Sequence, residues 1–175
     1  NWAGKTVSSA MGRCTYNNKK YVLADIPGTY SLMAQSAEEE VARDFICFQN
    51  PDAVIVVCDA TCLERNLNLV LQTIEITPKT VVCVNLLDEA ERKNIHVDIK
   101  KLETFLGVPA VGVTAREGKG LDKLMEAVER VIENRPESPF IPVYDAELEE
   151  EIQKITAAAE PLTNGKISRD GQLCV

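Results

Sequence analysis

Apolar and polar positions follow two different periods along the first 135 residues. Short, nearly continuous apolar runs at 20–25, 53–59, 80–84 and 108–113 are typical of strands that are buried on both faces. In the helical pattern at 63–76, one face collects Leu63, Leu67, Val70, Leu71 and Ile74. Because strands and helices alternate, the pattern predicts an α/β fold with a doubly wound, mostly parallel sheet flanked by helices.

Turn and cap residues set the boundaries of these elements. Asn17 and Asn18 predict a hairpin turn between strands at 13–16 and 20–25. Ser36 followed by Glu39 is a capping box, which predicts a helix that runs to about residue 49. Asp98 and Gly107 are expected to bound a short helix, and a further helix is predicted at 121–134.

The sequence changes character after residue 135. Three prolines within 136–145 predict a stiff connector, and 146–159 has the pattern of one more helix. After Pro161 the chain is polar and aperiodic, as in a frayed end. We therefore expect one domain at 1–135, the connector, and a partial helical domain with a tail at 146–175.

Composition narrows the function classes. The net charge of -8 argues against a nucleic-acid partner, because a phosphate backbone would be repelled. The longest apolar run, 53–58, is far shorter than the roughly 18 residues that span a bilayer, and the N-terminal residues lack a secretory pattern. The six cysteines and the single His96 have no zinc-site spacing, so we expect reduced core thiols in a cytosolic domain.

The segment 25–32, with the sequence Asp-Ile-Pro-Gly-Thr-Tyr-Ser-Leu, is the first candidate for chemistry. An apolar strand that ends in Asp25 would deliver a carboxylate to the carboxyl edge of a parallel sheet, where ligands bind. Gly28 can bring its N–H close to an anion, and Pro27 stiffens the approach. This is the D-x-x-G pattern of GTP-binding domains, although the same residues also form an ordinary exit from a strand into a turn.

Two further motifs close later strands. Asn85-Leu86-Leu87-Asp88 follows the run at 80–84, and Thr114-Ala115 follows the run at 108–113. Their order and spacing after 25–32 are those expected for guanine recognition, although Asn85 and Asp88 could also serve as a helix cap.

Together these residues resemble the ferrous iron transport protein B family, a bacterial membrane Fe²⁺ transporter with a cytosolic GTPase head. The resemblance covers residues 1 to about 159 and is most specific at 1–7, 25–32, 59–67 and 85–88. It implies a GTPase-like, three-layer fold and a GTP-binding regulatory domain that couples GTP binding and hydrolysis to iron uptake. It also implies a soluble, cytoplasmic chain that acts at the cytoplasmic face of the inner membrane, with the transporter's own membrane region and a second copy as possible partners.

The resemblance also assigns roles around the γ-phosphate. The motif at 1–7 corresponds to switch I, so Thr6 would bind Mg²⁺ and the γ-phosphate, whereas Lys5 only imitates the lysine of a phosphate loop. Asp25 would hold a Mg²⁺-bound water, and the Gly28 N–H would contact the γ-phosphate. The expected cofactors are GTP or GDP and Mg²⁺, with Thr6 and Gly28 as the catalytic residues.

Around the base, Asp88 would accept both N–H donors of the guanine edge and Asn85 would serve the N7 and O6 side. The Ala115 N–H would bond O6 while Thr114 shapes the loop, and Leu86 stands where many GTPases have lysine. The nucleotide-binding residues expected from the resemblance are Asp25, Ile26, Pro27, Gly28, Asn85, Leu86, Leu87, Asp88, Thr114 and Ala115.

In this family the first strand and the phosphate loop precede the motif at 1–7. We therefore expect a G domain without those two elements, in which the strands at 20–25 and 53–59 would flank the missing one. Little GTP hydrolysis is expected of residues 1–175 alone, because the phosphate loop supplies the amides and the lysine that hold the phosphates. The alternative is a hydrolysis-deficient binding or interaction module.

Overall fold

The computed structural model describes residues 10–33 and 36–134. Thr6, the connector at 136–145 and the predicted helical tail lie outside the described residues. Among the described helices, none has both the length and the apolar character needed to cross a bilayer.

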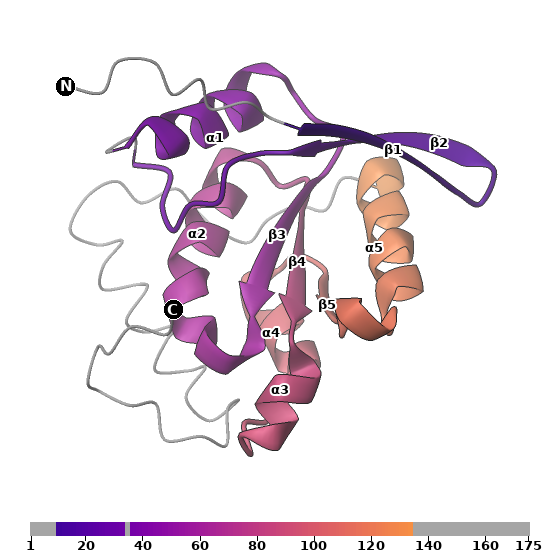
Figure 1. Cartoon of the computed structure of the whole chain (residues 1–175). Coiled ribbons are helices and arrows are strands. Elements are labelled where there is room, and N and C mark those ends of the chain that lie inside the picture. Colours follow the sequence, from indigo (N-terminus) through magenta and orange to yellow (C-terminus); the bar gives the residue numbers. More distant parts are fainter. Residues whose placement is uncertain (1–9, 34–35, 135–175) are drawn as a thin grey trace.

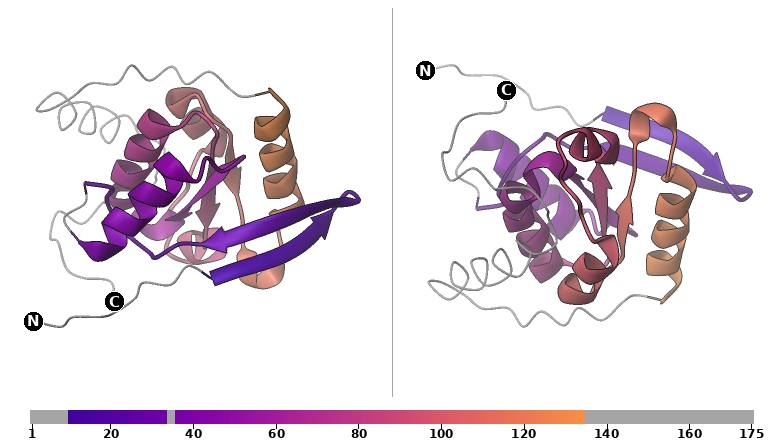
Figure 2. Two further views of the ribbon diagram at one scale, coloured as in Figure 1. Left: turned by 90° about the horizontal axis from the view of Figure 1, so that it is seen from above. Right: turned by 90° about the horizontal axis from the view of Figure 1, so that it is seen from below.

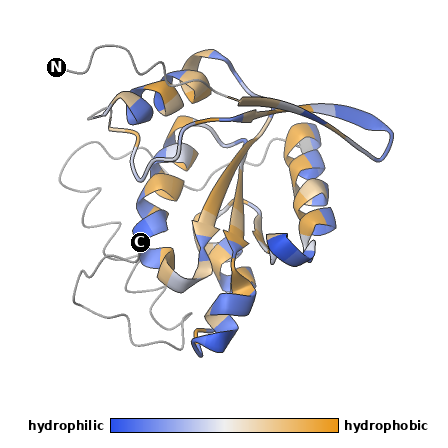
Figure 3. Ribbon diagram, in the orientation of Figure 1, coloured by the Kyte–Doolittle hydropathy of each residue, from blue (hydrophilic) through white to orange (hydrophobic). Residues whose placement is uncertain are grey.

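A parallel three-stranded sheet forms the centre of the described structure (Figure 1). Its strands are β3 (Val54–Asp59), β4 (Thr80–Asn85) and β5 (Ala110–Gly112), in the order β3-β4-β5. Their residues are almost entirely apolar, as expected for strands covered on both faces (Figure 3). The prediction of a parallel sheet is confirmed, and β5 is shorter than the predicted run at 108–113.

Helices cover both faces of this sheet, which confirms the layered α/β arrangement. On one face α2 (Leu63–Ile76) buries the stripe predicted from its sequence, and α4 (Ile99–Leu106) joins the same core. On the other face α5 (Leu121–Asn134) packs Ala127, Val128 and Val131 against Val81 of β4 (Figure 1). Asp98 caps α4 and Gly107 ends it with φ 68°, as predicted.

The helix α1 (Ala37–Phe48) closes a third small core. The Ser36 side chain accepts the Glu39 N–H at 3.2 Å, which confirms the predicted start of the helix. Ala42 and Ile46 on its inner side pack against Leu32, which is 5% exposed. The segment 25–32 is therefore anchored at its C-terminal end by a buried side chain.

One prediction about the sheet is wrong. The strand β2 (Lys19–Asp25) does not join the parallel sheet; it pairs antiparallel with β1 (Ala10–Tyr16) in a separate two-stranded sheet. Asn17 and Asn18, with φ of 47° and 60°, form the predicted turn. Figures 1 and 2 show this hairpin at the end of the parallel sheet opposite the helix α3 (Leu87–Arg92).

The outer edge of β3 has no strand partner among the described residues. Val57 in the middle of this strand is 61% exposed, which is unusual for an apolar residue of a central sheet. The open edge agrees with the expectation that β2 and β3 are not adjacent strands.

Polar contacts that centre on Glu129 hold the hairpin to α5. Glu129 accepts hydrogen bonds from the Tyr21 hydroxyl at 2.7 Å and from Asn17 Nδ2 at 3.1 Å. Lys19 Nζ lies 3.3 Å from the same carboxylate and 3.0 Å from Glu133. The hairpin is therefore attached to the rest of the domain largely by polar contacts around Glu129.

We predict that this attachment depends on pH. The Tyr21 hydrogen bond is the main cause that lowers the pKa of Glu129 from its ordinary value of 4.5. The attachment therefore contributes fully above about pH 4.5 and is lost as the pH falls below that value. Glu129→Gln should imitate the low-pH state at neutral pH, with faster hydrogen exchange of the hairpin amides. Glu103→Gln, which removes an exposed carboxylate that pairs with Arg130 of α5, is the control, and equal exchange in both variants would contradict the prediction.

Candidate functional site

The carboxyl ends of the three parallel strands bring polar residues to one edge of the sheet. Asp59 at the end of β3 is the register partner of Asn85 at the end of β4. Thr114 follows β5 two residues beyond its last strand residue, Gly112. We call Asp59, Asn85 and Thr114, with the residues that follow the last two, the carboxyl edge; ligands of open α/β sheets bind at such edges.

The structure brings the two guanine-type motifs into direct contact. Asn85 Oδ1 accepts the Ala115 N–H at 3.1 Å, and the Leu87 N–H donates to the Val113 carbonyl at 3.4 Å. A Cβ on Gly112 would lie 2.6 Å from the Leu87 side chain, so a larger residue at this position would require Leu87 to move. The predicted proximity of the Asn85 and Thr114 motifs is therefore found, with the Ala115 N–H engaged by Asn85.

The sequence did not reveal that Asp88 lies in a helix. Leu86 has φ 63°, and this left-handed residue starts the short helix α3 directly after the strand. The turn directs Asp88 back toward the loop after β5, where Arg116 forms an ion pair with Asp88 Oδ2. Arg92 also reaches this oxygen, at 3.2 Å.

The other carboxylate oxygen of Asp88 is the most informative atom of the site. Asp88 Oδ1 is buried and has no hydrogen-bond partner in the structure. A buried charged acceptor without a donor is costly, which marks it as a position where a ligand donor would be favourable. The carboxyl edge therefore presents an acceptor that is complementary to an N–H group.

The loop after β5 is rigidly built. Thr114 is 6% exposed and its N–H donates to the Lys119 carbonyl at 3.0 Å, which closes the loop at its base. Gly120 has φ 82°, and a Cβ there would lie 2.5 Å from the Gly112 carbonyl oxygen. These contacts fix the position from which Ala115 and Arg116 reach Asn85 and Asp88.

The segment 25–32 approaches the site differently from the prediction. Asp25 ends a strand of the two-stranded hairpin and not a strand of the parallel sheet. The residue that lies beside Asn85 at the carboxyl edge is Asp59. Gly28 is exposed, and a Cβ there would meet no heavy atom within 4 Å, so its surroundings are open.

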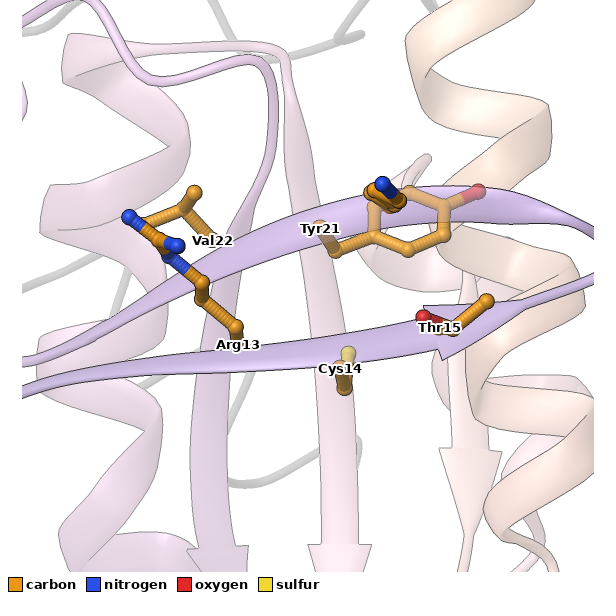
Figure 4. Close-up of a pocket in the computed structure, with 6 residues that line it drawn as sticks. Arg13, Cys14, Thr15, Tyr21 and Val22 are labelled. Carbon is orange, nitrogen blue, oxygen red and sulfur yellow. The ribbon is translucent and has the colours of Figure 1, made fainter.

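Two other features of the described residues do not contribute to this site. A pocket on the hairpin contains none of the predicted site residues (Figure 4); it is lined by Arg13, Cys14, Thr15, Lys20, Tyr21 and Val22. Burial raises the pKa of Cys58 to about 12 and that of Cys83 to about 11. Both thiols therefore stay protonated at neutral pH, as predicted for core cysteines, whereas Cys47 is exposed and lies outside the core.

Comparison with known proteins identifies the origin of this arrangement. The sequence profile described as "Ferrous iron transport protein B" matches residues 1–128. The Fe(2+) transporter FeoB of Salmonella typhimurium is 38% identical over 134 residues, which are 74% of this chain and 17% of that protein. The Fe(2+) transporter FeoB of Escherichia coli K12 matches with the same identity and coverage. The chain thus spans about a sixth of the length of these curated relatives.

Solved structures agree with the sequence comparison. The FeoB G-domain from Methanococcus jannaschii is similar with a TM-score of 0.69 and 38% identity, covering 74% of this chain and 83% of that chain. The cytosolic domain of T. maritima FeoB in GMPPNP form has a TM-score of 0.75 and 32% identity, covering 99% of this chain and 65% of that chain. The chain therefore belongs to the ferrous iron transport protein B family and corresponds to its N-terminal G domain.

Proposed function

We propose that this chain recognises guanine nucleotides and that GTP binding and hydrolysis at this site regulate a ferrous iron transporter. The buried Asp88 Oδ1 carries the proposal, because it is an acceptor to which none of the described residues donates a hydrogen bond and which an N–H group of a ligand could satisfy. A structure of the similar T. maritima protein in GMPPNP form supports a nucleotide as that ligand.

Guanine fits the donors and acceptors at the carboxyl edge. Its Watson–Crick edge has two adjacent N–H donors, and a carboxylate accepts both, whereas adenine offers a different arrangement. For Asp88 to accept both donors, Arg116 must leave Asp88 Oδ2 or share it. Asn85 Oδ1 already accepts the Ala115 N–H, so the Asn85 amide N–H₂ is the group that can donate to the N7 and O6 side of the base.

We assign the contacts with the phosphates and Mg²⁺ to Thr6 and to residues 25–28. Asp25 and Thr6 carry hard oxygen donors, which suit Mg²⁺, a cation that needs few protein ligands when phosphates supply the rest. Bound Mg²⁺ would neutralise charge on the phosphates. Ile26 and Pro27 lead to Gly28, whose exposed backbone can approach the γ-phosphate without steric hindrance.

A phosphate-sensing segment connected to a base-binding edge gives a switch. Loss of the γ-phosphate would release residues near Gly28 while the guanine contacts at Asp88 persist. We propose that this change is passed to the membrane region of the intact transporter at the cytoplasmic side of the inner membrane. The Fe(2+) transporter names of the similar proteins support iron as the transported ion.

The first prediction tests base recognition. Asp88→Asn replaces an acceptor with a donor and should shift the preference from guanine toward xanthine nucleotides. The loss of the paired contacts should weaken GTP binding by about 1–3 kcal/mol, because a polar group of the base is left unpaired. Titration of the full protein with fluorescent GTP, ATP and XTP analogues measures the change.

The control is Glu91→Gln, which removes one negative charge from the same short helix at an exposed position. It should leave the nucleotide preference unchanged. If wild-type protein binds the three analogues equally, or if Glu91→Gln has the same effect as Asp88→Asn, guanine recognition by Asp88 is wrong.

The second prediction distinguishes the role of Thr6 from that of Lys5. In the full protein, Thr6→Ala should lower Mg²⁺-dependent GTP hydrolysis but spare GDP binding, because GDP has no γ-phosphate to order this segment. Lys5→Ala should leave both properties nearly unchanged. A collapse of GDP affinity in Lys5→Ala would show that Lys5 belongs to a phosphate loop and that the assignment of Thr6 is mistaken.

A further inference from the structure

The second half of the segment 25–32 forms its own turn. The Thr29 hydroxyl donates to the Ser31 carbonyl at 2.7 Å and accepts the Ser31 N–H at 3.2 Å. The Met33 N–H donates to the Ser31 hydroxyl at 3.1 Å. These local bonds fix the turn that presents Tyr30, so the direction of the Tyr30 ring depends on the backbone just after Gly28.

The helix α2 holds this turn at two places. The Leu32 N–H donates to Gln72 Oε1 at 2.6 Å, and this bond is buried. Nearer the start of α2, the guanidinium carbon of Arg65 lies 3.9 Å from the centre of the Tyr30 ring. Arg65 and Gln72 are seven residues apart, so both side chains leave the same face of the helix.

The Leu32–Gln72 hydrogen bond is buried, whereas the Tyr30–Arg65 contact is exposed to solvent. Gln72 is 6% exposed, and the Leu32 side chain is packed in the core with α1, so this end stays attached as long as the domain is folded. Tyr30 is 57% exposed and Arg65 is an exposed residue, so their stacking can open without disturbing the core. The stacking of Arg65 on Tyr30 is therefore the contact that can open or close when the backbone at Gly28 moves.

The same turn of α2 is attached to the carboxyl edge. Asn66, next to Arg65, accepts the Asp59 N–H through its Oδ1 at 2.7 Å. Asp59 is the register partner of Asn85. Neighbouring residues at the start of α2 therefore contact both parts of the site: Arg65 stacks on Tyr30, and Asn66 bonds Asp59 at the carboxyl edge.

We propose that Arg65 is a positioning residue that sets the segment 25–32 relative to the carboxyl edge by stacking on Tyr30. This inference rests on the proposed function, because it gives the Gly28 N–H its place with respect to a nucleotide whose base lies at Asp88. The planar guanidinium stacks on an aromatic face, which an ammonium group does less well. The ligand beside Gly28 would be a nucleoside triphosphate. The Arg65–Tyr30 contact would favour its binding over that of the diphosphate.

The first test needs no nucleotide. In Arg65→Ala the amides of residues 28–32 should exchange hydrogen about two- to fivefold faster, as expected for the loss of one exposed cation–π contact. Tyr30→Leu should have the same effect, Tyr30→Phe should have little, and Arg65→Lys should be intermediate. The double variant Arg65→Ala with Tyr30→Leu should exchange no faster than either single variant, because the two residues act through one contact.

The matched control is Arg130→Ala, which removes an exposed arginine that pairs with Glu103 on another helix at 3.4 Å. It should leave exchange at residues 28–32 unchanged. Unchanged exchange in Arg65→Ala, or additive effects in the double variant, would overturn the proposal.

The second test compares the affinities of the full protein for a GTP analogue and for GDP. Arg65→Ala should lower the affinity for a non-hydrolysable GTP analogue about two- to fivefold and leave the affinity for GDP unchanged, since only the triphosphate reaches Gly28. An equal loss for both nucleotides would reduce Arg65 to a general structural role. If wild-type protein bound neither nucleotide, the proposed function would fail, whereas the exchange experiment would still decide whether Arg65 positions the segment.

Discussion

The parallel register of β3, β4 and β5 is the constraint on which the site depends. It sets Asp59 beside Asn85 and Val84 beside Gly112, so that the residues after each strand meet at one edge. A slip of one residue would turn every side chain of a strand to the opposite face. The slip is prevented because Val81, Val82 and Val84 are fully buried against helices on both faces. The positions of the polar residues at the carboxyl edge are therefore set by the packing of apolar side chains in the strands.

The hairpin and the segment 25–32 are connected to this frame by weaker contacts. Glu129 holds the hairpin to α5 by polar interactions at the surface, and Arg65 holds Tyr30 by an exposed stacking contact. Within the segment 25–32, Leu32 is buried in a core and the partly buried Ile26 packs against the same cluster. Such a division suits the proposed switch, because the carboxyl edge follows strands that are packed on both faces, whereas exposed contacts that hold the hairpin and Tyr30 can open without unfolding the domain.

The sequence predicted those features that depend on local patterns. The buried stripe of α2, the caps at Ser36 and Asp98, and the hairpin turn are each encoded within a few residues. The position of β2 was mispredicted because strand pairing is non-local and an Asp-ended apolar run has the same pattern in either sheet. The helix α3 was missed because it starts at a non-glycine residue with positive φ. The Arg116–Asp88 pair joins residues 28 positions apart, which no periodicity encodes.

The central claim is that the unpartnered carboxylate oxygen of Asp88 is the acceptor for a guanine base. A crystal structure of the full protein with GDP tests it most directly. We expect the guanine N1 and N2 atoms to lie within hydrogen-bond distance of the two Asp88 oxygens, with Arg116 displaced from Oδ2. A GDP base bound elsewhere, with the Arg116–Asp88 pair intact and Asp88 Oδ1 still without a donor, would contradict the claim.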